Sequence, residues 1–189
     1  MSIVLCGDWL GRKLQHHSWE YFAEAAKVLH GVERICLSGG EPTFHPQFAE
    51  LVPKFKTLFA CKTLAMVTDG WGVVKHFDVI SVNFDEIDFS YYHTNPGALA
   101  MIKYQMPHIK LNVFDAGFNA AGFTSRDKRG PGGPCERAWW RSKTIAYADG
   151  RIFGCCVAPG IEGAESVLPI VGQRVDIPNP PCAECWWSE

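Results

Sequence analysis

The sequence predicts an α/β fold organised around a parallel sheet of about five strands. Short apolar runs alternate with segments of helical apolar spacing through the first 115 residues, and strands separated by helices are typical of parallel sheets. Of the 189 residues, 47% are hydrophobic and 20% are charged, which argues against a disordered chain. A complete (β/α)8 barrel typically needs about 250 residues, so that fold is not expected.

Five short segments are expected to form the strands, and four longer ones the helices. The expected strands are Ser2–Cys6, Arg34–Leu37, Thr63–Thr68, Val79–Phe84 and Ile109–Phe114. The expected helices are Trp19–Leu29, Pro46–Phe59, Trp71–Phe77 and Pro96–Tyr104. Ser18 precedes the first helix and Thr94 or Asn95 the last, and these residue types cap helix N-termini. Functional residues are expected in the loops after the strands, because ligands bind outside the carboxyl ends of parallel strands.

Glycine and proline concentrate after the fifth expected strand. Residues 116–134 include the run Arg129-Gly130-Pro131-Gly132-Gly133-Pro134, which is typical of a loop or a boundary. Asp149-Gly150 separates two strand-like runs, Thr144–Ala148 and Arg151–Cys155, and predicts a hairpin. The expected parts are therefore an α/β unit over residues 1–115, a Gly/Pro-rich connection over 116–134 and a small C-terminal lobe over 135–189.

Five of the eight cysteines lie in residues 135–189. The N-terminus lacks the basic start and long apolar stretch of a signal peptide, so a cytoplasmic location is expected. Clustered cysteines in a reducing cytosol bind metal more often than they form disulfides. Cys135 and Cys155 bracket the expected hairpin, and Cys182 and Cys185 form a CxxC pair. Four such thiolates suit a [4Fe–4S] cluster or structural zinc.

Cys156 is an alternate to Cys155 as a ligand. Successive residues of a strand point to opposite faces, so only one of these two neighbours is expected to bind a metal.

A glycine-rich turn follows the second expected strand. Gly39 and Gly40 precede Glu41 and Pro42; successive glycines let the backbone approach a ligand closely, and Glu41 can accept hydrogen bonds from a cationic group. Thr68-Asp69-Gly70 follows the next expected strand. Two such loops at one edge of a sheet predict a pocket.

Several of these segments resemble the radical S-adenosylmethionine (SAM) enzymes. Leu37–Phe55 looks like their GGEP segment, and Thr68-Asp69-Gly70 resembles their Thr-Asn-Gly turn, with Asp69 in place of asparagine. Ser81 begins a segment similar to their fourth strand. The spacing Cys135-x14-Gly150-x4-Cys155 followed by CxxC is similar to the twitch half of a SPASM domain, which holds an auxiliary [4Fe–4S] cluster. The resemblance covers roughly residues 33–185.

The resemblance implies a partial (β/α) barrel with a small C-terminal hairpin and a cysteine-rich iron–sulfur lobe. It implies that SAM binds at Gly39, Gly40, Glu41, Pro42, Thr68, Asp69, Gly70 and Ser81, with its amino group at the GGEP segment. It also implies an auxiliary cluster on Cys135, Cys155, Cys182 and Cys185. An active enzyme of this kind cleaves SAM to a radical that takes hydrogen from a substrate, and draws electrons from a donor such as a flavodoxin or a ferredoxin.

The chain departs from the family at the catalytic cluster. Radical SAM enzymes hold that cluster with Cx3Cx2C at the end of the first strand, whereas this chain has only Cys6 there and Ile3 at the middle position. Cys6 is thus a candidate remnant of the motif. The sequence leaves three alternatives: a radical SAM enzyme with a second [4Fe–4S] cluster, a non-catalytic relative acting as electron carrier, binding module or partner subunit, and a zinc-stapled binding domain.

Charge and hydropathy do not indicate a nucleic-acid partner or a membrane span. The formal net charge of -2 provides no global attraction for nucleic acid. A membrane span needs about 18 or more consecutive apolar residues, and no such run occurs. No motif identifies the substrate.

Overall fold

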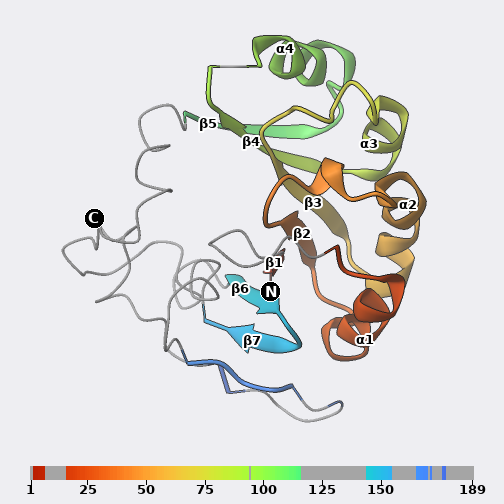
Figure 1. Cartoon of the computed structure of the whole chain (residues 1–189), viewed down its shortest axis with the longest axis vertical. Helices are drawn as coiled ribbons and strands as arrows, with labels where there is room; N and C mark the ends of the chain where they lie inside the picture. The colour runs from red at the N-terminus through yellow and green to blue at the C-terminus, as the bar shows by residue number, and fades with distance from the viewer. Residues whose placement is uncertain are drawn as a thin grey trace, which may run out of the picture.

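A computed structural model of the chain describes residues 2–6, 16–93, 95–115, 144–154, 165–169, 171, 176 and 177. These residues form a seven-stranded sheet in the order β5-β4-β3-β2-β1-β6-β7 (Figure 1). The strands are β1 (Ser2–Cys6), β2 (Arg34–Ser38), β3 (Thr63–Thr68), β4 (Glu86–Tyr91), β5 (Lys110–Asp115), β6 (Thr144–Ala148) and β7 (Arg151–Phe153). The helices are α1 (Trp19–Leu29), α2 (Phe48–Phe59), α3 (Phe77–Asn83) and α4 (Pro96–Gln105), with one turn of 3-10 helix, η1 (Pro42–Phe44).

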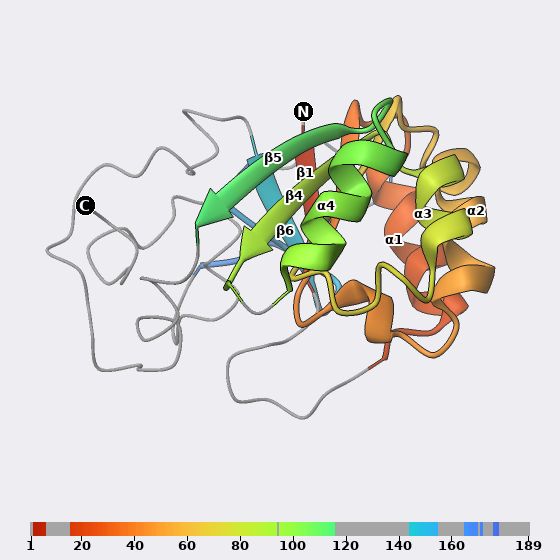
Figure 2. The same cartoon turned by 90° about the horizontal axis from the view of Figure 1, so that it is seen from above.

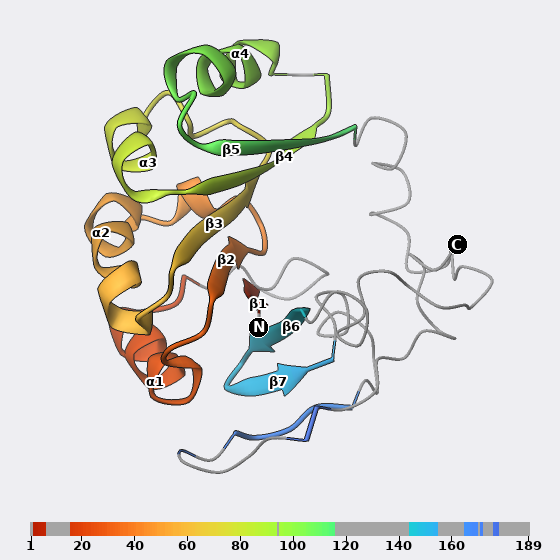
Figure 3. The same cartoon turned by 180° about the vertical axis from the view of Figure 1, so that it is seen from behind.

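Strands β1 to β5 are parallel and lie side by side in chain order. Each connection therefore advances by one strand in the same direction. Such crossovers are right-handed, so their helices come to lie on one face of the sheet. Figures 2 and 3 show α1 to α4 together on that face. The predicted α/β architecture with a parallel sheet is confirmed.

The sheet continues on the other side of β1. Strand β6 pairs with β1 in parallel, and β7 pairs with β6 in antiparallel orientation. Asp149 and Gly150 form the two-residue turn between them with φ values of 50° and 77°, as a type I′ hairpin requires. The predicted hairpin is therefore present, but it is hydrogen-bonded into the main sheet. The described strands form an open sheet that ends at β5 and β7, and most of residues 116–189 lie outside the described part.

The core lies between the sheet and its helices. Each of its strand residues is almost fully buried, and aromatic and aliphatic side chains of α1 and α2 cover them. The strand residues include Ile35, Leu64, Met66, Ile87 and Phe89, and the helix residues include Phe22, Leu29, Phe55 and Phe59. Burial of one such side chain contributes about 1.5–3 kcal/mol, so this layer positions the strand ends.

The opposite face of the sheet is partly polar. Arg34 on β2 donates from Nε to Glu86 Oε2 at 2.9 Å and from Nη2 to Asp88 Oδ2 at 3.0 Å, both on β4. Asn112 on β5 donates to Glu86 Oε1 at 2.7 Å and to Asp88 Oδ1 at 2.8 Å. Ala65 of β3 lies beside Glu86 in the register, and its small side chain leaves room for Arg34 to span β3. These bonds tie β4 to β2 and β5.

The expected strand over residues 79–84 is wrong. Most of this segment belongs to α3, and the fourth strand is Glu86–Tyr91. A parallel sheet needs a crossover between consecutive strands, and α3 provides it between β3 and β4. In β4, Glu86 and Asp88 lie on the polar face while Ile87 and Phe89 enter the core. The preceding run of residues 79–84 contains more apolar residues and was therefore chosen as the strand in place of residues 86–91.

None of the helices that the structure describes is long and apolar enough to cross a membrane.

Candidate functional site

The loop after β2 forms a tight turn at the carboxyl edge of the sheet. Gly39 has a φ of 121°, a value that side chains with a Cβ rarely adopt. A Cβ at Gly40 would have no atom of the described residues within 4 Å, so this part of the chain leaves open space beside Gly40. Pro42 begins η1, and the Glu41 side chain caps it by accepting from the Thr43 N–H. The glycines thus turn the chain back so that Glu41 faces β3.

Glu41 joins this loop to the loop after β3. Its Oε1 accepts from the Thr43 N–H at 3.1 Å and from the Thr43 hydroxyl at 2.6 Å. The Thr68 hydroxyl lies 2.9 Å from both carboxylate oxygens, and the Asp69 N–H donates to Oε2 at 2.8 Å. Thr43 and Thr68 are only 2% and 1% exposed. Three predicted site residues, Glu41, Thr68 and Asp69, therefore meet at one carboxylate.

The surroundings of the Glu41 carboxyl disfavour its ionised form. Burial of the carboxyl raises the pKa of Glu41 to about 7; hydrogen bonds from Thr43 oppose the rise, and the Asp69 carboxyl adds to it.

Two glycines hold the loop after β3 in place. Gly70 has a φ of 90°, and a Cβ there would lie 2.7 Å from the Phe89 ring and 2.8 Å from Ala98 Cβ. A Cβ at Gly72 would lie 2.0 Å from Thr43 Oγ1. The Gly70 N–H donates to the Thr68 hydroxyl at 3.0 Å, and the Trp71 N–H to Asp69 Oδ1 at 3.0 Å. The turn is therefore packed against both η1 and β4.

The chain after β4 reaches the same edge. Burial raises the pKa of Tyr92, which follows β4, and the charge of Asp69 raises it further. Neither Thr43 nor Tyr92 was among the residues predicted from sequence. Thr43 directly follows the predicted Glu41-Pro42 pair, so its position in the sequence could have identified it as a site residue. Tyr92 follows the fourth strand, so it could be found only once that strand was placed at residues 86–91.

Cys6 ends β1 at this edge, where its backbone pairs with Ser38 of β2. Ile3, at the position of the family's middle cysteine, lies inside β1. Its backbone neighbours are Ile35 on one side and Ile145 on the other. Position 3 therefore belongs to the sheet and not to a loop after the strand.

Ser81 does not join the other predicted site residues. It lies in the second half of α3, where its hydroxyl donates to the Asp78 carbonyl at 3.0 Å. Its own carbonyl is 2.7 Å from His108 Nε2, just before β5. Because α3 leads into the amino end of β4, Ser81 is at the edge of the sheet opposite Glu41.

The cysteines predicted to bind metal, Cys135, Cys155, Cys182 and Cys185, with Cys156 as the alternate, lie outside the described residues. Within the described ranges, no group of three or more His, Cys, Asp or Glu side chains is arranged to hold a metal ion.

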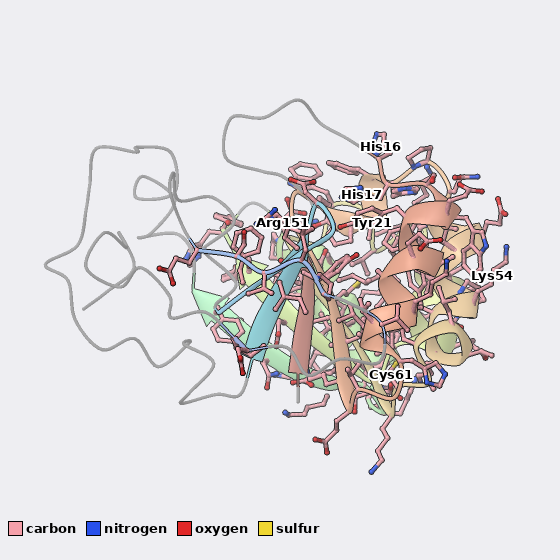
Figure 4. The ribbon with its side chains drawn as sticks, turned by 90° about the horizontal axis from the view of Figure 1, so that it is seen from below. His16, His17, Tyr21, Lys54, Cys61 and Arg151 are labelled. Atoms are coloured by element: carbon pink, nitrogen blue, oxygen red, sulfur yellow. The ribbon has the colours of Figure 1, made fainter. Side chains whose placement is uncertain are left out.

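Burial raises the pKa of Cys36 to about 12 and also raises that of Cys61. Cys61 precedes β3 and lies at the opposite end of the molecule from His16 (Figure 4). Cys61 therefore lies at the amino end of β3, the edge of the sheet opposite Glu41, and Cys36 lies within β2.

No protein-family model matches the chain. Two curated relatives are both named GTP 3′,8-cyclase. The one from Yersinia pestis is 30% identical over 102 residues, which cover 50% of this chain and 31% of the relative. The one from Edwardsiella ictaluri is 30% identical over 96 residues, which cover 47% of this chain and 29% of the relative. The matched part of this chain thus corresponds to less than a third of each relative, and it is similar to part of enzymes with that name.

Proposed function

We propose that this chain is a radical-SAM-like protein that binds SAM at the junction of the loops after β2 and β3. GTP 3′,8-cyclase, the name of both relatives, is a radical SAM enzyme. The main supporting observation is that Glu41 holds the two loops together through hydrogen bonds to Thr43, Thr68 and Asp69. These loops are the segments that resemble the SAM-binding segments of the superfamily.

The residues at the junction suit the amino-acid part of SAM. The ammonium group of SAM is a cation, and Glu41 and Asp69 both present carboxyl oxygens. The open space beside Gly40 allows a ligand to approach the backbone.

In this proposal the protein binds and orients the ligand. Glu41 and Asp69 hold the ammonium end, and the backbone around Gly40 lies alongside it. When bound, SAM and a reduced [4Fe–4S] cluster supply the radical chemistry. Cys6, at the end of β1 beside Ser38, is the proposed thiolate toward such a cluster. A flavodoxin or a ferredoxin is the proposed electron donor.

An auxiliary [4Fe–4S] cluster on Cys135, Cys155, Cys182 and Cys185 is the second part of the proposal. Four thiolates are the usual ligands of such a cluster. A zinc ion is the alternative, because it also binds four thiolates.

One observation favours a second candidate function, a non-catalytic relative that binds SAM or carries electrons. Ile3 lies within β1, between β2 and β6, so it replaces the middle cysteine of the family motif with a sheet residue. Cys6 alone provides one thiolate, whereas a SAM-cleaving cluster needs three. In this alternative the chain acts as a binding or partner subunit.

Anaerobic reconstitution with iron and sulfide, followed by metal analysis, tests the cluster proposal. About four irons per chain and broad absorbance near 400 nm indicate one [4Fe–4S] cluster, and about eight irons indicate two. Colourless protein with stoichiometric zinc would contradict the iron–sulfur proposal.

SAM binding and SAM cleavage are measured separately. Equilibrium dialysis should show SAM binding to the wild-type chain and a loss of at least about tenfold in affinity for Glu41→Ala, because an acceptor for the charged ammonium is lost. Absence of binding to reconstituted wild-type protein would contradict the SAM proposal. With dithionite, deoxyadenosine formed above a Cys6→Ala control would support the enzyme, whereas binding without cleavage would support the non-catalytic alternative.

A further inference from the structure

The outer edge of β5 is the longest unpaired strand edge in the part of the chain that the structure describes. β5 has six residues, pairs with β4 on one side and ends the sheet on the other (Figures 1 and 2). At the opposite end of the sheet, β7 has only three residues, and Ile152 exchanges two backbone hydrogen bonds with Val167, at 2.8 and 3.0 Å. An open edge presents N–H and C=O groups that can pair with a strand of another molecule.

The register of β5 identifies the backbone groups at this edge. The Lys110 N–H donates to the carbonyl of Asp85, which precedes β4, at 2.9 Å. Backbone groups of successive strand residues point to alternate sides, so those of Lys110 and Asn112 face β4. The N–H and C=O groups of Leu111 and Val113 therefore face away from β4, toward the open edge.

The strand lacks the features that usually keep an edge from pairing. Such features are outward charges, a proline or a bulge. Residues 111–114 are Leu-Asn-Val-Phe, and the register with β4 is unbroken. The ammonium of Lys110 lies 3.0 Å from Glu86 on β4, so this charge points back over the sheet. Val113 and Phe114 are 48% and 50% exposed, which makes the edge both apolar and unprotected.

We propose that β5 is a dimerisation strand: it pairs antiparallel with β5 of a second copy of this chain, and the two sheets become continuous. A two-fold axis beside Asn112 places Leu111 opposite Val113 of the second copy, and Val113 opposite Leu111 of the second copy. Each of these pairs exchanges two backbone hydrogen bonds, as in an antiparallel ladder. The same surface of each copy then forms the interface, as two-fold symmetry requires.

The side chains of β5 match one another in this register. Leu111 packs on the core side of the sheet, so Val113 lies on that side too and meets Leu111 of the second copy there. On the polar face, Lys110 lies opposite Phe114 of the second copy, and an ammonium attracts an aromatic ring. The other register that pairs five residues of each strand places Leu111 opposite Asp115, an apolar residue against an acid. This match of β5 to itself selects a second copy as the partner.

The same axis brings α4 near its counterpart. α4 packs against β4 and leads into β5 (Figure 2). Strands are spaced about 4.8 Å, so two helices that each cover the second strand from the axis lie roughly 15 Å apart, a little more than one helix diameter. Lys103 is the only charged residue of α4, and its neighbour Tyr104 is 73% exposed. This near absence of charge favours close approach of the two copies.

Sedimentation equilibrium of the full chain tests the dimer. The wild type should have twice the mass of one chain at high concentration. Val113→Lys places a charge on the edge, and Val113→Pro removes an outward N–H without removing a bond to β4. Each should raise the dimer dissociation constant at least about tenfold, because apolar contacts or hydrogen bonds are lost on both sides of the axis. Val82→Lys, at a valine of α3 that is 80% exposed, is the matched control and should stay within about twofold of the wild type.

Asn112→Cys tests the register. Beside the axis, Asn112 meets its counterpart as a non-hydrogen-bonded pair, in which the Cα atoms are about 4.5 Å apart, within the range that a disulfide spans. Mild oxidation and peptide mass spectrometry should identify a disulfide between position 112 of two copies. Val82→Cys measures the background from exposed thiols and should give no comparable cross-link.

A wild-type chain that stays monomeric at its highest soluble concentration would overturn the inference. A dimer whose dissociation constant is unchanged in both Val113 variants would also overturn it, because another surface would then form the dimer. If those variants do not fold, as judged by circular dichroism, the cross-link at position 112 decides: its formation supports the paired edge, and its absence overturns it. None of these measurements requires SAM, so they are independent of the proposed function.

Discussion

The backbone N–H of Asp69 donates a hydrogen bond to Glu41 Oε2 at 2.8 Å. This bond crosses from the loop after β3 to the loop after β2. Glu41 also accepts hydrogen bonds from the buried hydroxyls of Thr43 and Thr68, so one carboxylate joins the loops after two strands. Changes to its partners are therefore expected to affect both stability and ligand binding.

Thr68→Val should destabilise the chain by about 1–3 kcal/mol, because it removes a hydroxyl that bonds Glu41 and leaves buried polar groups unsatisfied. The hydroxyl also accepts from the Gly70 N–H at 3.0 Å, and valine has nearly the same shape. Thr68→Ser keeps the hydroxyl and should cost no more than about 1.5 kcal/mol for the lost methyl group. Urea unfolding measures both. Equal losses would show that packing, not the hydroxyl, matters at this position.

Gly72→Ala should destabilise the chain by about 1–3 kcal/mol through overpacking. The new Cβ would lie 2.0 Å from Thr43 Oγ1, so η1 or the turn must move. Gly97→Ala in α4 is the matched control, because a Cβ there meets no atom within 4 Å in the part of the chain that the structure describes. It should stabilise the helix by about 0.5–1 kcal/mol. Thermal unfolding compares the two variants, and a neutral Gly72→Ala would contradict the close packing of Thr43 and Gly72.

The pH dependence of stability should reveal Glu41. Its pKa is raised from 4.5 to about 7 in the folded chain, so between these values the folded state binds more protons than the unfolded state. The free energy of unfolding should therefore fall as the pH rises from about 4.5 to 7, with a contribution on the order of 1–3 kcal/mol.

Glu41→Gln should remove that contribution to the pH slope. Burial alone would raise the pKa of Glu86, but hydrogen bonds from Arg34 and Lys110 lower it overall. In both proteins this carboxylate therefore makes the free energy of unfolding rise with pH at lower pH, a slope opposite to that of Glu41. Urea unfolding at several pH values measures the difference between variant and wild type. A difference that does not change with pH would contradict the raised pKa.

Arg34→Met should cost about 1–3 kcal/mol, because it removes the guanidinium that bonds two partly buried carboxylates and leaves them only the weaker partners Asn112 and Lys110. The side chains of Glu86 and Asp88 are only 11% and 19% exposed. Lys54→Met removes the exposed i,i+4 pair with Glu50 and should change stability by less than about 1 kcal/mol. Chemical unfolding measures both, and similar costs would contradict the role of the network across β2, β4 and β5.

Much of the fold is visible in local patterns. The helix Trp19–Leu29 has its buried residues Phe22, Ala25, Ala26 and Leu29 on one face, a spacing that the sequence displays directly. Asn95 caps α4 by accepting from the Ala98 N–H at 3.4 Å, and Asp149-Gly150 forms the hairpin turn. Each of these features depends on neighbours along the chain, so a local reading finds it.

The fourth strand could not be found in the same way. In the sequence, the charged residues Glu86 and Asp88 suggest a loop. In the structure they are strand residues whose carboxylates bond Arg34 and Asn112 on other strands. The apolar run before them looks like a strand, and only the need for a crossover between β3 and β4 makes it a helix. The misplacement of Ser81 follows from that one error.

The sequence by itself determined the first three strands, the fifth strand, the helices α1, α2 and α4, and the two loops that carry Glu41 and Asp69, because helical and strand periodicity and turn residues are local properties. The tertiary structure decided that Glu41 meets Thr68 and Asp69, that β6 pairs with β1 and that Ser81 lies at the other edge. These relationships depend on parallel strand register and on the direction of each crossover. They bring together residues far apart in the chain, and the raised pKa of Glu41 exists only where burial and the neighbouring carboxyl act on it together.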